Sequence, residues 1–518
     1  MKCTCGFLGH SVFGCEDKRS SRRSKAKLSV LGLAAASVLF AGVASAQGVF
    51  HLVDSSSDGA NLGTAADPFH SIRDAVAVVQ AGDQVIVHGD TAENPRLYEE
   101  RVDLGASSAS GSDGQRIVFR AYPPHSVTMY GFETGDMDYV TIAGFQITIP
   151  EWLIEEEWQA KYALFIESDY VEVRHNNFIE IPGAAIRSDD DEPFPTGGFI
   201  SNNYIYHTGM GMVIFGNDWL IEGNEIERLV YNPLTDFDAD YTRAFGNNIT
   251  FRKNYFHGTD EEEVGGSHTD GFQTFAIGAY MHGLTIDSNI VIDFDQGVIM
   301  EATNGPGTVS DVTICNNVFD AGSFGGAYGV VAKYEITNLR VDHNLVANID
   351  NHGVYFRFGA AGSIQNNIFF NAGSNYRGDE ESSVEGGYNL IDREGYPYHS
   401  EDGDLLEVDP MFVDEGNWAG QDGVPFTADD GFKLWPESPA IDAGIEVAVL
   451  SDLFGNARPH MIGAGVDMGP YEALQIDTTG CAAAEDGSSS SSPLSGDVVL
   501  LGLVVFPFFR SAFRRIKN

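Results

Sequence analysis

The sequence predicts an all-β protein whose strands wind into a right-handed parallel β-helix, a solenoid of stacked coils. Two observations lead to this prediction. Short segments through the middle of the chain alternate apolar and polar residues with the period of two that is typical of β-strands. The same pattern, in which an asparagine separates two such segments, recurs at intervals of 21 to 35 residues. That interval is the length of one solenoid coil with two or three strands.

The asparagine of this repeat marks the same turn in every coil. Asparagine side chains at one turn can stack their amides from coil to coil, as amide ladders do in stacked strands, and no helical repeat would place them there so often. The predicted ladder consists of Asn177, Asn203, Asn224, Asn254, Asn289, Asn317, Asn344, Asn367 and Asn389.

A solenoid needs caps that cover its terminal coils. The segment 69–80 has the amphipathic pattern of a short helix, and a strand is expected to follow it at 83–88. Residues 410–472 lack the repeat and are expected to form the C-terminal cap. The predicted organisation is a signal peptide (1–46), an N-terminal cap with the first coils (47–137), the main β-helix (138–400), a C-terminal cap (401–474) and a linker with a sorting or anchor tail (475–518).

Three short motifs near the ends of the solenoid resemble those of secreted β-helix proteins. They are Gly63-Thr-Ala-Ala-Asp-Pro-Phe69 before the helix, Ser438-Pro-Ala-Ile-Asp-Ala-Gly444, and Asp467-Met-Gly-Pro-Tyr-Glu472. The resemblance is to the pectate-lyase-like β-helix superfamily and covers about residues 48–473. It implies the fold far more strongly than any one activity.

The first 46 residues have the three parts of a secretory signal peptide. Six basic residues lie within 17–27, an apolar run covers 28–44, and Ala44-Ser45-Ala46 forms a cleavage box. We expect cleavage after Ala46 and export of the chain. The alternative is an uncleaved membrane anchor, for which the apolar run is short.

The C-terminal tail also has the pattern of a targeting signal. A serine run at 488–492 is followed by the apolar segment 498–509 and then by basic residues. This order, with Cys481 upstream, resembles bacterial C-terminal surface-sorting tails, so we expect retention at the cell surface or outer membrane. A plain C-terminal anchor is the alternative, and either would make this tail the only contact with a membrane.

The charge of the chain excludes some partners. Residues 47–499 contain 19 Lys and Arg against 73 Asp and Glu. A surface this acidic does not bind nucleic acid by bulk charge, but it suits divalent cations such as Ca²⁺, whose ligands are oxygen atoms. Only Cys315 and Cys481 lie beyond the leader, so no disulfide framework is implied. We expect the mature protein to be a monomer.

A second strand in each coil follows a glycine, and its outward side chains form the candidate site. Counting from that glycine predicts an outward column of Arg187, Phe215, Phe275, Glu301, Lys333 and Arg357, beside a second column that includes Gln273 and Tyr355. Because neighbouring coils lie about 4.8 Å apart, Glu301, Lys333 and Arg357 are expected to form one polar patch. The longest coils flank it, with inserted loops at 231–245 and 259–270.

The patch has residue types suited to cleavage of an acidic polysaccharide by β-elimination. Lys333 could act as the base, Arg357 could bind a uronate carboxylate, and Glu301 with Asp270 or Asp295 could hold Ca²⁺. Tyr355, Gln273, Phe275, Arg187 and His268 are the candidate substrate-binding residues. The Glu-Lys-Arg grouping resembles the site of the alginate lyase and chondroitinase B group, which uses a Lys base, an Arg and a Ca²⁺ held by Asn and Glu. The chain departs from that site because no second Glu lies two residues from Glu301.

Other interpretations remain open at this point. Two carboxylates facing one glycosidic bond, Asp270 or Asp295 with Glu301, would suit a glycoside hydrolase. Outward aromatic side chains would suit a glycan-binding or adhesin surface without catalysis. Glu301, Lys333 and Arg357 could also be a surface ion-pair ladder that only balances charge.

Overall fold

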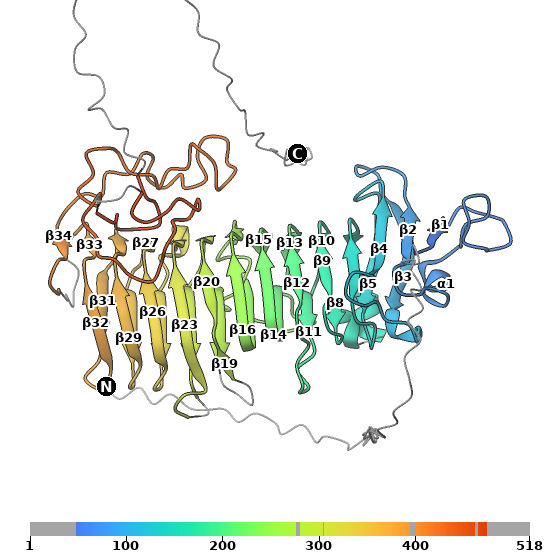
Figure 1. The fold of residues 1–518 in the computed structure, drawn as a ribbon, viewed down its shortest axis with the longest axis horizontal. Coiled ribbons are helices and arrows are strands. Elements are labelled where there is room, and N and C mark those ends of the chain that lie inside the picture. The colour runs from blue at the N-terminus through green and yellow to red at the C-terminus, as the bar shows by residue number, and fades with distance from the viewer. Residues whose placement is uncertain are drawn as a thin grey trace, which may run out of the picture. The chain divides into compact units, whose positions relative to one another are not determined.

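A computed structural model describes residues 48–156, 158–275, 280–303, 305–393, 400–460 and 465–473. The predicted signal peptide and the predicted C-terminal tail lie outside these residues. The described residues form 34 strands with parallel pairing between coils, and Figure 1 shows the strands of successive coils side by side. No helix among the described residues is long and apolar enough to span a membrane. The predicted all-β, right-handed parallel β-helix is confirmed.

The strands lie on three faces of the solenoid. Face I contains β1 (Phe50–Val53), β2 (Gln84–His88), β4 (Ile117–Tyr122), β6 (Val140–Ala143), β9 (Glu172–Arg174), β12 (Phe199–Ser201), β19 (Met281–His282), β20 (Thr285–Asp287), β23 (Val309–Cys315), β26 (Thr337–Asp342), β29 (Ala361–Gln365) and β32 (Ser383–Gly387). Face II contains β7 (Gln146–Ile147), β10 (Asn177–Ile179), β13 (Tyr204–Thr208), β15 (Glu225–Leu229), β17 (Tyr255–His257), β21 (Ile290–Ile292), β24 (Val318–Asp320), β27 (Leu345–Ala347), β30 (Ile368–Phe370), β33 (Leu390–Ile391) and β34 (Leu405–Leu406).

Face III carries the candidate site. It contains β8 (Tyr162–Ile166), β11 (Ala184–Ser188), β18 (Asp270–Phe275), β22 (Gln296–Glu301), β25 (Tyr328–Lys333), β28 (His352–Arg357) and β31 (Ser374–Gly378). Four longer strands contribute to two faces each: β3 (Arg96–Asp103) and β5 (Val127–Glu133) to faces II and III, and β14 (Met210–Glu222) and β16 (Thr242–Arg252) to faces III and I.

The asparagine ladder lies at the corner between faces I and II. Each ladder side chain is buried, and its amide nitrogen donates to the amide oxygen of the next, as from Asn254 to Asn289 at 2.9 Å. The residue before each ladder asparagine has a positive φ, which produces the sharp corner. The last asparagine, Asn389, donates to the carboxylate of Asp404, which ends the ladder.

One ladder position differs from the prediction. The first member is Asn176, which is fully buried and donates to Asn203 at 3.1 Å, whereas Asn177 begins β10. The positive φ falls on His175, so the corner comes one residue earlier than expected in this Asn-Asn pair.

The N-terminal helix is shorter than the predicted 69–80. Helix α1 covers Ile72–Val76, with the side chain of Ser71 accepting from the backbone of Asp74 at its start. Its buried residues Ile72 and Val76 pack into the same core as β2. The remaining short helices are α2 (Glu151–Glu156), η1 (Leu104–Ala106), η2 (Trp158–Lys161) and η3 (Gly322–Phe324).

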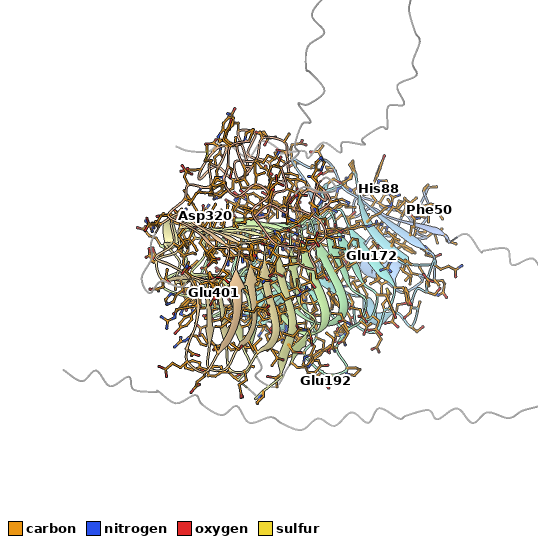
Figure 2. All side chains as sticks on the ribbon, turned by 60° about the vertical axis from the view of Figure 1, so that its left-hand side comes forward. Phe50, His88, Glu172, Glu192, Asp320 and Glu401 are labelled. Atoms are coloured by element: carbon orange, nitrogen blue, oxygen red, sulfur yellow. The ribbon has the colours of Figure 1, made fainter. Side chains whose placement is uncertain are left out.

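The C-terminal residues 408–460 and 465–473 lie over an outer face rather than only at the end of the solenoid. Their buried members Phe412, Trp418 and Phe432 pack on the outward side chains of face II, including Leu345 and Ile368. The indole of Trp418 also donates to Asp320 of β24, which Figure 2 labels. Figure 1 shows this segment in orange and red beside β27 and β33. Face II is therefore covered there, whereas the outward side chains of Glu301 and Lys333 on face III remain partly exposed.

Candidate functional site

Strand register on face III brings the predicted catalytic residues together. Glu301 of β22 pairs with Lys333 of β25, which pairs with Arg357 of β28. The preceding member of this row is Phe275 of β18, which pairs with Glu301. The glycine used for counting gave the correct register here because it is the second residue of each of these strands, which all have the same length.

A cavity of about 390 Å³ opens beside this row. It is lined by residues of β18, β22 and β25 and of the loops before them: His268, Gln273, Thr274, Phe275, Asp295, Gln296, Ile299, Glu301, Ala327, Tyr328 and Lys333. Most of the residues that the sequence nominated therefore surround one space. Tyr328 and Gln296 were not among the predicted site residues. They begin the strands that end at Lys333 and Glu301, which were predicted.

Glu301 and Lys333 form an ion pair at the edge of the cavity. The Nζ atom of Lys333 lies 2.6 Å from Oε1 of Glu301, and their side chains are 18% and 28% exposed. Both groups are thus accessible to a ligand in the cavity.

Three cationic side chains follow one another along this edge. Arg357 lies next to Lys333, and its guanidinium stacks over the rings of Tyr355 at 5.2 Å and Phe358 at 4.6 Å. Arg377 of β31 also approaches the Tyr355 ring, at 4.9 Å from its centre. The Nε atom of Arg357 is buried and has no hydrogen-bond partner among the described residues. This edge can therefore receive an anionic group.

An aromatic cluster lies between these cations and the cavity. Tyr328, His352 and Tyr355 have ring centroids 4.6 to 6.3 Å apart. Burial, with the charges of Arg377 and Arg357, lowers the pKa of His352 to about 4. The imidazole is therefore neutral at pH 7 and adds no positive charge to this edge.

A buried carboxyl group lies behind the cavity. Asp270 accepts from the amides of Gln273 at 2.9 Å and Gln296 at 3.2 Å. Burial, followed by the charges of Asp240 and Asp295, raises the pKa of Asp270 well above its usual value. Asp270 therefore retains its proton more readily than an exposed aspartate does, while Asp295 lines the cavity.

Asp240 and its partner Arg243 were missed at the sequence level. Arg243 of β16 pairs with Gln273 and forms ion pairs with Asp240 at 2.5 Å and Asp238 at 2.9 Å. The register of β16 places Tyr241 where the neighbouring coils have glycine, so the glycine pattern skipped this coil. Counting 30 residues, one coil length, from Gln273 would have found Arg243.

The structure does not bring together the carboxylates proposed as Ca²⁺ ligands. Asp270 pairs with Gln296, and Glu301 lies five residues further along the same strand, which corresponds to about 16 Å. Glu301 is paired with Lys333 instead. Asp270, Asp295 and Glu301 therefore do not form one calcium site, and no chemical step is derived through Ca²⁺. Within the described parts of the chain, the one group of three suitable ligands is Glu225, Glu227 and His257 on face II.

Arg187 is displaced from its predicted column. It pairs with Val213 rather than Phe215, so it belongs to the row of Gln273 and Tyr355. It lies three coils from Gln273, beside Tyr162 and Phe215, and does not line the cavity. The shift arises because Gly183 aligns with Gly209 and not with Gly211, so counting from Gly183 starts two residues too early.

Comparisons with known proteins agree with this architecture. The family model described as a right handed beta helix region matches residues 194–369. The structure of XylC with xylose aligns with a TM-score of 0.50 and 13% identity, over 82% of this chain and 98% of that chain. Pectate lyase Pel9A aligns with a TM-score of 0.41 and 14% identity, over 82% and 96%. The GH136 lacto-N-biosidase from Eubacterium ramulus aligns with a TM-score of 0.39 and 12% identity, over 66% and 68%.

Comparison with curated protein sequences gives no match. At such low identity the XylC structure, which aligns with a TM-score of 0.50, reports on the fold alone. Together with the family match and the three faces of parallel strands, it shows that the chain has a right-handed parallel β-helix fold.

Proposed function

We propose that this chain is a secreted, surface-retained protein that binds an acidic polysaccharide on face III and cleaves it by β-elimination. The observation that supports this most is the placement of Lys333, Arg357 and Arg377 on three consecutive coils, the first of which contributes Lys333 to the cavity. The chain as a whole carries a net charge of −45, so a cationic edge of this kind is an exception on its surface. It favours a substrate with regularly spaced carboxylates.

The side chains suit the separate parts of the reaction. Arg357 would bind the uronate carboxylate, which makes the adjacent C–H bond more acidic. Lys333 would remove that proton, the C–H electron pair would form the C=C bond, and the C–O bond to the leaving sugar would break. Before it acts as a base Lys333 must lose a proton, and Glu301, 2.6 Å away, is placed to accept it. The leaving oxygen then takes that proton from Glu301, which returns both side chains to their starting charges.

The cavity would hold the sugar that carries the reacting carbon. Phe275 and Tyr328 offer ring faces for a pyranose, while Gln273 and His268 offer polar groups for its hydroxyls. Tyr355 lies one coil further along, between Arg357 and Arg377. It would support the neighbouring sugar of the chain.

The test is the ultraviolet absorbance of unsaturated uronates. The chain from residue 47 to 475 would be incubated with alginate, pectate and chondroitin sulfate, with Ca²⁺ and with chelator. We expect absorbance to rise with one polymer, and Lys333→Ala to lower the rate about 100-fold or more. Lys253→Asn, which changes a lysine at a corner where φ is positive, is the control. A fully active Lys333→Ala variant would exclude Lys333 as the base, and loss of activity with chelator would indicate a metal.

A second candidate function is glycoside hydrolysis, which is favoured by the raised pKa of Asp270. Two neighbouring carboxyl groups in different environments can divide the roles of general acid and general base. Under this alternative, the same polymers would release reducing ends without absorbance, and Asp295→Asn would abolish the release while Lys333→Ala would not. Binding without any product would instead favour the non-catalytic glycan-binding interpretation.

A further inference from the structure

Two glutamates and a histidine lie together on the outside of face II, on two neighbouring coils. Glu225 and Glu227 belong to β15, and His257 ends β17. One carboxylate oxygen of each glutamate and one imidazole nitrogen all lie within 4.8 Å of one another. Strand pairing accounts for this geometry, because Glu227 pairs directly with His257 and Glu225 points to the same side two residues earlier. The three side chains can therefore reach one ion.

The two carboxylates are not balanced by a lysine or an arginine among the described residues. Glu225 lies 3.0 Å from Nε2 of His257, which is charged only when it is protonated. The arginine that follows Glu227, Arg228, is bound through two nitrogens to Glu263 instead. Like charges on one strand repel each other, so a bound divalent cation would stabilise both carboxylates.

Neighbouring side chains hold two of the three groups in place. The hydroxyl of Tyr204 on β13 donates to Oε2 of Glu227 at 2.6 Å. Burial, followed by this hydrogen bond, raises the pKa of Tyr204, so the hydroxyl keeps its proton. The ring of Tyr255 stacks on that of His257 with centroids 3.9 Å apart. Support from residues outside the ligand set is typical of metal sites because it fixes the orientation of each ligand.

The group is accessible from solution. The side chains of His257 and Glu225 are 17% and 36% exposed. The C-terminal residues that cover face II pack on the outward side chains of later coils, among them Val318 and Leu345. An ion can therefore approach the three side chains from solvent.

The residue types indicate which ion the group suits. An imidazole nitrogen binds transition metals such as Zn²⁺, whereas Ca²⁺ and Mg²⁺ prefer oxygen ligands throughout. One imidazole and two carboxylates give Zn²⁺ three protein ligands and leave a fourth position for water. The two negative charges also match the charge of the ion.

We propose that Glu225, Glu227 and His257 form a zinc site that ties β15 to β17. The site lies on a different face from Glu301 and Lys333, so it does not depend on the proposed cleavage of polysaccharide. The loop that follows His257 contributes His268 to the cavity. A bound ion would fix the point at which this loop leaves the solenoid.

The test is a calorimetric titration of residues 47–475 with ZnCl₂, after treatment with a chelator and its removal. We expect one ion to bind per chain, about 100-fold more tightly than Ca²⁺ or Mg²⁺. Glu227→Gln and His257→Gln should each weaken zinc binding about 100-fold, because each removes a ligand atom. Tyr204→Phe removes only the support of a ligand and should weaken binding about tenfold.

Two controls separate loss of the site from a general change. His88→Gln alters a histidine on face I, outside the group, and should bind zinc as wild type does. Without zinc, the melting temperatures of the Glu227 and His257 variants should stay within about 2 °C of wild type, since both side chains are partly exposed. Zinc should raise the melting temperature of wild type and not that of His257→Gln.

Three outcomes would overturn the inference. Zinc binding that is equally tight in wild type and His257→Gln would indicate an adventitious ion only, held by other acidic groups. Absence of zinc binding by wild type would remove the site. Tighter binding of Ca²⁺ than of Zn²⁺ would show that the imidazole is not a ligand. Each of these outcomes leaves the proposed polysaccharide cleavage intact, because that activity is measured separately.

Discussion

The asparagine ladder and the outward row of face III are built by the same coils but follow opposite rules. At the ladder corner each coil repeats one residue type, and each side chain is satisfied by the copy before and after it, as Asn289 is by Asn254 and Asn317. In the outward row the residue type changes from coil to coil beside the cavity, from Phe275 to Glu301 and then to Lys333.

This contrast separates stability from function. A buried amide needs partners at fixed positions, and only an identical neighbour provides them in every coil. An outward side chain has no such requirement because water can satisfy it. The residue types of the row can therefore differ from coil to coil. Such differences can place opposite charges around one cavity, which chemistry on a ligand requires.

Breaking the ladder should have the largest effect on stability. Asn289→Ala removes the oxygen that accepts from the backbone N–H and from the side-chain amide of Asn254. It also removes the amide group that donates to Asn317 and to the Phe251 carbonyl. We expect the free energy of unfolding to fall by about 3–5 kcal/mol, since buried polar groups lose their partners. Chemical denaturation would measure this, with Asn94→Ala in an exposed turn as the control. A loss below about 1 kcal/mol would show that the ladder is not a major source of stability.

A buried carboxyl group on the outside of face I should make stability depend on pH. Burial raises the pKa of Asp342 to about 7, and one of its oxygens has no partner among the described residues. The unfolded chain ionises this group near its ordinary pKa of about 3.9, so its contribution to stability is present below that pH and is lost as the pH rises to 7.

Asp342→Asn should remove this loss. The variant is expected to be more stable than wild type by about 2–4 kcal/mol at pH 8 and by much less at pH 4. Thermal melting of both proteins from pH 4 to pH 8 gives the comparison. Stability curves that run parallel over this range would contradict the assignment.

Neutralising the outward row should have the smallest effect on stability. The Glu301–Lys333 pair lies at the rim of a cavity, where ion pairs contribute about 0–1 kcal/mol. Glu301→Gln combined with Lys333→Met should therefore leave the unfolding free energy within about 1 kcal/mol of wild type while removing polysaccharide cleavage. A large loss of stability would favour the charge-balancing ladder over the catalytic interpretation.

Much of the fold could be predicted because its local signals repeat. The positive-φ residue followed by asparagine recurs at every corner from His175 to Tyr388, and the resulting spacing identified the coils. The predicted ladder position was wrong by one residue where two asparagines are adjacent, at Asn176 and Asn177. The glycine that marks the strands of face III is replaced by Tyr241 in one coil, so the sequence pattern missed that strand. The same reasoning placed Glu301, Lys333 and Arg357 side by side, although their catalytic roles stay predictions.

The sequence was sufficient for the coil, its period and the alternation of inward and outward side chains, because all three depend on contacts between residues close in the chain. Tertiary structure was needed to place 408–460 and 465–473 on face II, to bring Asp240 to Asp270, and to bury Lys161 beside Arg187. Each of these contacts joins segments whose connecting loops differ in length from coil to coil. The spacing of residues in the sequence therefore does not predict which segments meet. The charge state of a side chain likewise depends on burial and on neighbouring charges, which exist only once the coils are stacked.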